Sequence, residues 1–194
     1  ARNKIPFFCD ATQAVGKVEV NIKNQGMNMM ALSAHKFNGP KGLGALYVEK
    51  GTSLEPQIHG GGHQGGLRSG TMNVPGIVGL EKSLVLAYKR GKEGTLQEIQ
   101  KYRDEFESKL KESFQIEING VEANRLPNIT NIQFLNSSPE DILNKWSQLY
   151  AVGTGSACTS EKIENSHVLK SMGINTMGLR MSLTIKPRGN SLGG

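Results

Sequence analysis

The 194-residue sequence predicts an α/β fold, because short apolar runs of strand length are followed by longer stretches with helical periodicity. Apolar runs at residues 5–9 and 29–32 each end in a polar cluster, as strands of an open sheet do at their carboxyl ends. Apolar residues recur at helical spacing over 75–87 and again over 96–114. Between these two stretches, residues 90–94 are polar and interrupted by glycine, which indicates a domain boundary.

The first predicted strand, residues 5–9, is followed directly by Asp10 and Gln13. Open α/β sheets place ligand contacts at the carboxyl ends of their strands. Lys36 follows Asp10 by 26 residues, which is enough chain for a connection to the next buried strand. We therefore expect Asp10 and Lys36 at the same edge of one sheet, on neighbouring strand ends. Cys9, inside the apolar run, is expected to be buried and inert.

The polar cluster after the second strand contains Ser33, His35 and Lys36, and Gly39 and Gly42 then favour a tight turn. A lysine at the mouth of a buried strand is costly as an ammonium, and the neutral amine is the nucleophile that attacks carbonyl groups. The neighbouring hydroxyl and imidazole suit an anion. The alternative is a plain strand end, with the lysine stem lying along apolar surface. Residues 43–48 are predicted to form a third strand.

A glycine-rich stretch, residues 60–71, lets backbone amides approach a ligand closely, and Arg68, Ser69 and Thr71 add groups that bind anions. A flexible surface loop without chemistry is the alternative. Asn73 is predicted to cap a helix that begins near Pro75. Its apolar face is expected to hold Ile77, Leu80, Leu84 and Ala87.

The second half is predicted to contain the helix 96–114, a strand over residues 128–135, and a helix that starts at Ser138 or Pro139. The small-residue loop 153–160 presents Cys158, and a helix capped by Ser160 and closed by Gly173 follows it. Residues 179–185 are expected to form a last strand that carries Arg180. The tail, 186–194, has no periodicity and is expected to be disordered.

Composition excludes several classes of protein. The net charge of +6 is spread along the chain without Lys/Arg blocks, so direct binding of nucleic acid is not expected. Cys9 and Cys158 lie far apart, which argues against a disulfide framework or a metal site and favours a reducing compartment. No run of about 18 apolar residues and no signal peptide is present. The chain begins at Ala1 close to a strand, and this start is not expected to be a natural N-terminus.

Taken together, the motifs resemble the C-terminal half of a cysteine desulfurase, a pyridoxal-phosphate enzyme of the class V aminotransferase type. The motifs, in family order, are Asp10-Ala-Thr-Gln13-Ala, Ser33-Ala-His35-Lys36 with Gly39-Pro-Lys-Gly42, Gly66-Leu-Arg-Ser-Gly-Thr71, and Ser156-Ala-Cys158-Thr-Ser160. The last motif is similar to that of the desulfurases of nitrogen fixation and iron–sulfur cluster assembly. The resemblance implies the type I fold of pyridoxal-phosphate transferases. Residues 1–91 would be the C-terminal part of the large cofactor-binding domain, 92–185 a smaller α+β domain, and 186–194 an atypical tail.

The resemblance also implies roles for the residues near the cofactor. Lys36 would form the Schiff base and later move protons, and Asp10 would pair with the pyridinium nitrogen. Gln13 would donate a hydrogen bond to the phenolic oxygen of the ring. Ser33 and His35 would hold the phosphate, and Thr71 would reach the phosphate of the cofactor in the other subunit of a homodimer.

For the substrate, the resemblance implies that Arg180 holds the carboxylate of L-cysteine and that Cys158 attacks its sulfur. The products would be L-alanine and an enzyme persulfide, used for iron–sulfur assembly or tRNA thiolation through an acceptor or scaffold protein. A cytoplasmic location is expected, with an organelle as the alternative. Cys158 could instead be a small core residue, and Arg180 could pair with a structural carboxylate. The alternative functions are an aminotransferase, a selenocysteine lyase or an inactive truncated chain.

Three departures from the family pattern matter. Relatives are considerably longer on the N-terminal side, where they carry a phosphate-binding turn, a histidine that stacks on the cofactor and an asparagine near its phenolic oxygen. The stretch between Gly173 and Arg180 is short, and the tail 186–194 replaces an acidic helix start. We therefore expect an incomplete piece of an enzyme, which by itself binds pyridoxal phosphate weakly.

Overall fold

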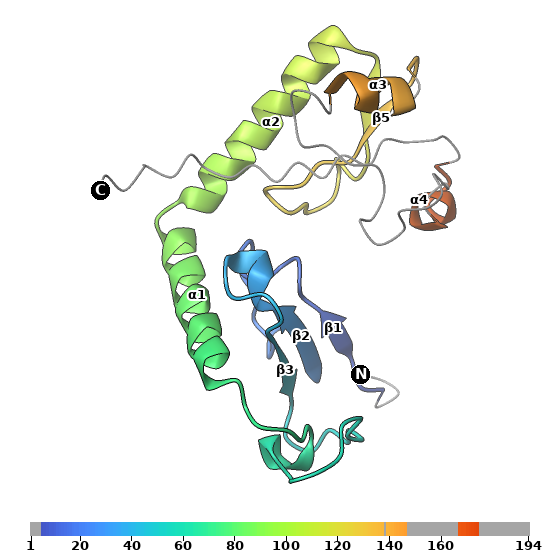
Figure 1. The fold of residues 1–194 in the computed structure, drawn as a ribbon. Helices are drawn as coiled ribbons and strands as arrows, with labels where there is room; N and C mark the ends of the chain where they lie inside the picture. Colours follow the sequence, from blue (N-terminus) through green and yellow to red (C-terminus); the bar gives the residue numbers. More distant parts are fainter. Residues whose placement is uncertain (1–4, 138, 147–166, 175–194) are drawn as a thin grey trace. The chain divides into compact units, whose positions relative to one another are not determined.

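The computed structural model describes residues 5–137, 139–146 and 167–174 (Figure 1). The chain divides into two compact units, Ala1–Gly94 and Thr95–Gly194. The sequence-based boundary between residues 91 and 92 falls within the last turn of a helix that continues to Lys92. The assignment of a cofactor-binding domain and a smaller domain to the two sides stays a prediction.

The first unit is built on a three-stranded sheet with the order β1-β2-β3. Its strands are β1 Phe8–Asp10, β2 Met29–Ser33 and β3 Gly44–Val48. β1 runs parallel to β2, with Asp10 opposite Ala31. β3 runs antiparallel to β2, with Gly44 opposite Ser33. The three predicted strands therefore form and pair in one sheet.

β1 differs from its prediction in position and burial. It covers Phe8–Asp10 instead of residues 5–9, and Phe7 bonds through its backbone to the Asn28 side chain instead. Cys9 packs against the core but is only half-buried, so its expected burial is wrong. The reason is that β1 is the edge strand of the described sheet, with Phe8 and Asp10 exposed on either side of Cys9.

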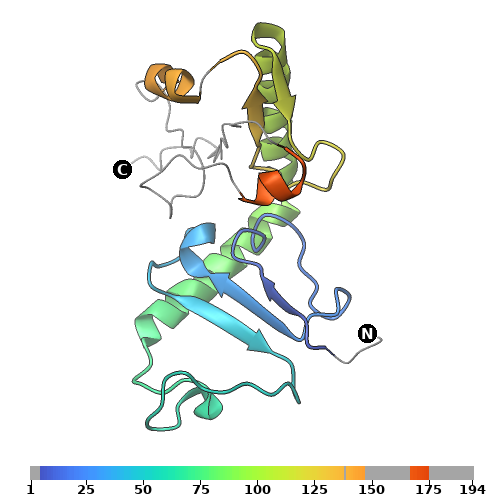
Figure 2. The same cartoon turned by 90° about the vertical axis from the view of Figure 1, so that its right-hand side faces the viewer.

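The helix α1 Val74–Lys92 covers one face of this sheet (Figures 1 and 2). Asn73 caps it as predicted, because its Oδ1 accepts a hydrogen bond from the Gly76 N–H at 3.1 Å. The predicted apolar face is partly wrong, since Ile77 and Leu84 are 40% and 38% exposed. The inward stripe instead consists of Gly76, Leu80, Ser83 and Ala87.

Small residues explain why α1 turns this face inward. A Cβ atom on Gly76 would lie 2.5 Å from Leu43 Cδ2, and one on Gly79 would lie 2.6 Å from Pro40 Cγ. The helix can therefore approach the segment after β2 only where side chains are absent. The buried core beneath it consists of Ala11, Val15, Met27, Met30, Ala34, Phe37 and Ala87.

Gly16, in the loop after β1, lies directly against this core. It adopts φ +77°, and a Cβ there would lie 3.0 Å from Phe37 Cβ and 3.1 Å from Ala87 Cβ. Gly26 also adopts a positive φ, +66°, but has open space around it. Alanine substitutions at Gly16 and Gly26 therefore separate the cost of backbone strain, which both share, from the cost of steric overlap, which only Gly16 has.

We expect Gly16→Ala to lower the free energy of unfolding by about 2–4 kcal/mol, from left-handed backbone strain plus overpacking. Gly26→Ala introduces only the backbone strain, and we expect it to lower the free energy of unfolding by about 1 kcal/mol. Denaturant unfolding followed by circular dichroism measures both losses. Equal losses in the two variants would show that Gly16 does not sit against Phe37 and Ala87.

The second unit combines helices with a small antiparallel sheet. Its elements are α2 Thr95–Ser113, β4 Ile116–Ile118, β5 Ile132–Phe134, α3 Pro139–Trp146 and α4 His167–Ser171. β4 and β5 pair antiparallel, and β4 was not predicted from the sequence. The rings of Phe114, Phe134 and Trp146 pack edge to face with centroids 5.6–6.1 Å apart. Gly173 ends α4 with φ +79°, as predicted.

α2 buries two charged residues that its sequence pattern does not reveal. Arg103 and Glu107 are 5% and 6% exposed. Arg125 donates two hydrogen bonds to the Glu107 carboxylate, at 2.7 and 3.0 Å. Arg103 donates to the backbone oxygen of Leu126 at 2.7 Å and to Asp104. The helix is thereby joined to the loop that precedes β5.

We expect Glu107→Ala to lower the free energy of unfolding by about 3–5 kcal/mol, because it leaves the Arg125 charge without its buried partner. Glu105→Ala is the control on the same helix. Its ion pair with Lys101 spans 3.9 Å and is largely exposed, so we expect a loss of at most about 0.5 kcal/mol. Equal losses would contradict the assigned network.

The contribution of Glu107 to the free energy of unfolding should depend on pH. Burial by itself raises the pKa of Glu107, but hydrogen bonds and charge from Arg125 outweigh it and hold the pKa below its ordinary value of 4.5. A carboxylate with a lowered pKa stabilises the fold above the unfolded-state pKa, and this contribution is lost as the pH falls through the folded-state pKa. The stability difference between the original chain and Glu107→Ala should therefore shrink below about pH 4.5.

None of the helices in the described ranges is both long enough and apolar enough to cross a membrane.

Candidate active site

The candidate site lies at the edge of the sheet where β1 and β2 end. Asp10 is the last residue of β1, and Ser33 is the last residue of β2. The 3₁₀ turn η1 Ala34–Phe37, which carries Lys36, follows immediately. Because the two strands are parallel neighbours, both ends lie at the same edge. The expectation that Asp10 and Lys36 follow neighbouring strand ends is confirmed.

Burial of the first and last residues of η1 explains how the turn presents its side chains. Ala34 and Phe37, three residues apart, are 0% and 4% exposed and anchor the turn in the core. A 3₁₀ helix has three residues per turn, so the two residues between these anchors face outward. His35 and Lys36 are accordingly exposed. The prediction that Lys36 is buried at the mouth of the strand is therefore wrong.

Gly39 closes this turn against the helix behind it. Its N–H donates to the Ala34 oxygen at 2.8 Å. A Cβ atom at this position would lie 2.9 Å from both Cβ and O of Ala34 and 2.5 Å from Ser83 Oγ. Asn38, just before it, adopts the left-handed conformation with φ +68°. The Asn-Gly pair thus ends η1 within about one turn and fixes the position of Lys36.

Asp10 is held as a carboxylate. Its Oδ1 accepts a hydrogen bond from the Thr12 backbone N–H at 2.9 Å. Hydrogen bonds from the side chain and backbone of Thr12 lower the pKa of Asp10 below its ordinary range. An exposed, ionised carboxylate at the end of a strand can accept a hydrogen bond from a protonated ring nitrogen.

Ser33 and His35 form a second polar pair at the same edge. Ser33 Oγ and His35 Nδ1 are 2.9 Å apart. This contact engages one ring nitrogen and leaves Nε2 for other partners. A hydroxyl and an imidazole held together in this way suit a phosphate or another anion.

Gln13 and Lys17 follow β1 and face each other. Lys17 Nζ donates a hydrogen bond to Gln13 Oε1 at 2.9 Å. Gln13 was predicted as a site residue, whereas Lys17 was missed. The signal available in the sequence was its spacing of four residues from Gln13, which places both on one side of a helical turn.

Thr71 lies away from this edge. β3 runs antiparallel to β2, so it leaves the sheet at the opposite edge from η1, and the glycine-rich loop follows from there (Figure 1). The loop contains the short turn η2 Gln64–Gly66 and a buried Ser69, and Thr71 is exposed. Within one chain, Thr71 is therefore not brought together with Lys36.

Cys158 and Arg180 lie outside the described residues, as do the loop 153–160, the strand 179–185 and the tail 186–194. Their predicted roles stay predictions.

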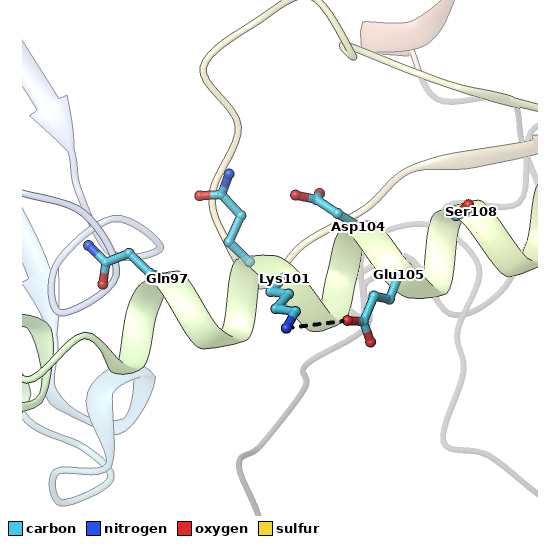
Figure 3. A pocket seen from close by; sticks show the side chains of 6 residues that line it. Gln97, Lys101, Asp104, Glu105 and Ser108 are labelled. Carbon is cyan, nitrogen blue, oxygen red and sulfur yellow. Dashed lines mark ion pairs between the residues drawn. The ribbon is translucent and has the colours of Figure 1, made fainter.

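A shallow hollow of about 520 Å³ runs along the polar side of α2 (Figure 3). Its lining residues are Gln97, Gln100, Lys101, Asp104, Glu105 and Ser108. Figure 3 shows these side chains spread along one helix, with the Lys101–Glu105 ion pair between them. None of the predicted site residues that the structure describes lines it, so the strand ends remain the candidate site.

Comparison with known proteins gives consistent matches. The profile of the class-V aminotransferase family matches residues 1–190. A cysteine desulfurase from Bradyrhizobium diazoefficiens is 44% identical over 167 residues, which cover 86% of this chain and 42% of that protein. A NifS-like protein from Rickettsia africae superposes with a TM-score of 0.80 at 29% identity, covering 93% of this chain and 48% of that one. The structure of SspA in complex with cysteine gives a TM-score of 0.70 at 31% identity, over 94% of this chain and 51% of that one.

The chain thus spans about half the length, or somewhat less, of the relatives that it matches. The solved relatives have the type I fold of pyridoxal-phosphate enzymes, and the mixed α/β architecture described above agrees with the predicted fold class. Pyridoxal 5'-phosphate is the cofactor of the family. Because the family profile matches residues 1–190 of the 194-residue chain, the chain belongs to the class-V aminotransferases.

Proposed function

We propose that this chain provides the cofactor-binding lysine and the sulfur-accepting cysteine of a cysteine desulfurase. The observation that carries the proposal is the parallel pairing of β1 and β2, which brings Asp10 and the Lys36 turn to one edge. The similarity to the Bradyrhizobium cysteine desulfurase supports the choice of reaction, and the SspA complex with cysteine supports the choice of substrate.

The polar and charged groups at this edge fit pyridoxal 5'-phosphate. When bound, this cofactor supplies an aldehyde that captures amines and a ring that accepts electrons. The lowered pKa of Asp10 keeps it negative, as a partner of a protonated ring nitrogen must be. Ser33 and His35 would hold the phosphate, and Gln13 would donate to the phenolic oxygen. Lys36 is exposed, so its amine is accessible to an aldehyde.

The sulfur transfer that we propose is balanced without an added oxidant. The Cys158 thiolate attacks the sulfur of L-cysteine, an S–S bond forms and the C–S bond breaks. The carbon skeleton takes up a proton at the former C–S carbon and leaves as L-alanine, while Cys158 carries a persulfide. Lys36 Nζ would move protons, and Arg180 would hold the substrate carboxylate.

The assembly and location are also proposed. The position of Thr71, away from Lys36 in its own chain, supports a homodimer in which Thr71 reaches the phosphate in the other subunit. A sulfur-acceptor or scaffold protein would receive the persulfide for iron–sulfur assembly or tRNA thiolation. Two widely spaced cysteines favour a reducing compartment, and we propose the cytoplasm.

The test is product analysis with L-cysteine as the only substrate, in a full-length enzyme that carries these residues. We expect alanine and enzyme-bound persulfide to form in equal amounts during the first turnover. Alanine that forms only when an oxo-acid is supplied, without persulfide, would overturn the proposal in favour of an aminotransferase.

A further inference from the structure

Lys17 is the charged residue of the site for which the proposed function has no role. Its side chain is half-buried, next to Gln13, with Nζ 2.9 Å from Gln13 Oε1. Within the described ranges, Lys17 forms no ion pair with a carboxylate. Its hydrogen-bond acceptor is therefore a neutral amide oxygen, although half-burying an ammonium is costly. A cation placed in this way calls for an explanation.

The backbone around Lys17 is firmly held. Ala11 and Val15 are buried in the core, and the N–H of Lys17 donates to the Ala14 oxygen at 2.9 Å. Gly16 packs against Phe37, the residue that follows Lys36. The turn that carries Gln13 and Lys17 is thus fixed against the turn that carries Lys36.

The charges support the same proximity. Burial, together with the positive charge of Lys36, lowers the pKa of Lys17 below its ordinary value. Lys17 and Lys36 therefore lie in one positively charged environment, which favours binding of an anionic ligand.

The chemistry of the contact decides how Gln13 is oriented. A lysine ammonium has only donors, so the Gln13 atom that faces it must be the carbonyl oxygen. The amide nitrogen then points away from Lys17. Because Gln13 is exposed, this N–H₂ group is available to a ligand as a donor.

We propose that Lys17 is a positioning residue that holds the Gln13 amide with its nitrogen toward the phenolic oxygen of pyridoxal phosphate. The inference rests on the proposed function, because it assumes that this cofactor binds beside Gln13. Without Lys17, the amide can rotate and present its oxygen, which cannot donate to a phenolate. Lys17 then acts through Gln13 and not by touching the substrate.

The test uses variants of a full-length enzyme that carries these residues, with pyridoxal 5'-phosphate as the probe. Lys17→Met keeps the stem but removes the donors, and Lys17→Arg restores a donor. Lys23→Met is the control, an exposed lysine in the same β1–β2 connection. Affinity and absorbance of the bound cofactor are measured, with circular dichroism to confirm folding.

We expect Lys17→Met to weaken cofactor binding about two- to tenfold, the effect of one hydrogen bond, and to shift the absorbance of the bound cofactor. Lys17→Arg should recover most of the affinity, and Lys23→Met should not change it. In a Gln13→Ala background, Lys17→Met should add no further loss, because the residue through which it acts is gone.

An equal loss from Lys17→Met with and without Gln13 would overturn the positioning role, and so would unchanged affinity and absorbance. A failure of the proposed function is distinguishable, since an aminotransferase of the same family would still bind the cofactor but would form no persulfide from L-cysteine. In that case, the ¹⁵N signals of the Gln13 side-chain amide still report the contact, and Lys17→Met must shift them for the orientation to stand.

Discussion

Lys36→Ala, made in a full-length enzyme that carries these residues, is expected to abolish the visible absorbance of lysine-bound cofactor and the turnover of cysteine. The turn η1 presents Lys36 outward at the edge where Asp10 also ends its strand. An amine joined to the cofactor aldehyde is the source of that absorbance, so removing the amine removes the band. Difference absorbance spectroscopy and an alanine assay measure the two losses.

Two other lysines lie close in the sequence or in space and serve as controls. Lys41 is exposed five residues after Lys36, and Lys41→Ala should leave the band in place. Lys17 shares the electrostatic environment of Lys36, but its Nζ is engaged by Gln13. A band that survives in Lys36→Ala and disappears in Lys17→Met would reassign the cofactor-binding lysine to Lys17.

Loss of fold does not explain the expected result for Lys36. The side chain is exposed, and the anchors of its turn are Ala34 and Phe37. Substitutions at exposed positions usually change the free energy of unfolding by no more than about 0.5 kcal/mol. Thermal unfolding of Lys36→Ala should therefore follow that of the unsubstituted enzyme.

The sequence predicted the strand ends well, because polar clusters and glycine turns punctuate each apolar run. The register that brings Asp10 opposite Ala31 was not predicted from the sequence. The exposure of Lys36 was predicted wrongly. A run of apolar residues indicates that a strand is buried, but not which residues of the next turn point into the core.

The inward face of α1 shows a second limit. Hydrophobic periodicity selected Ile77 and Leu84, whereas the helix turns Gly76 and Ser83 inward. The deciding factor is how closely Leu43 and Pro40 approach the helix, and spacing within the helix carries no information on this. Tertiary packing therefore overrides the apolar stripe.

Buried polar groups were missed for a related reason. Arg103 and Glu107 look like surface residues of an amphipathic helix. Arg125 offsets the burial of the Glu107 charge, and the Leu126 oxygen and Asp104 accept hydrogen bonds from buried Arg103. Lys17 was missed because a lysine four residues after a glutamine does not by itself indicate that the two side chains are in contact. Pairwise contacts of this kind become visible when the fold brings the partners together.

Cys158→Ser is the variant with the second large expected effect. Under the proposed function, the thiolate of Cys158 is the atom that accepts sulfur, and a serine hydroxyl cannot form a persulfide. We expect alanine release from cysteine to fall by about a thousandfold or more, while the cofactor absorbance that depends on Lys36 remains. Alanine production and the cofactor spectrum are measured on the same full-length protein.

Cys9→Ser is the matched control for Cys158, because it exchanges the same atom at the other cysteine of the chain. Cys9 is the middle residue of β1, packs against the core and is half-buried, so the exchange should cost some stability and leave sulfur transfer intact. Trapping the persulfide with an alkylating reagent after one turnover locates the sulfur directly. If Cys158→Ser still releases alanine at the original rate, Cys158 is a structural residue, and the aminotransferase alternative replaces the desulfurase. If Cys9→Ser instead abolishes turnover, the sulfur acceptor is the cysteine in the middle of β1, directly before Asp10.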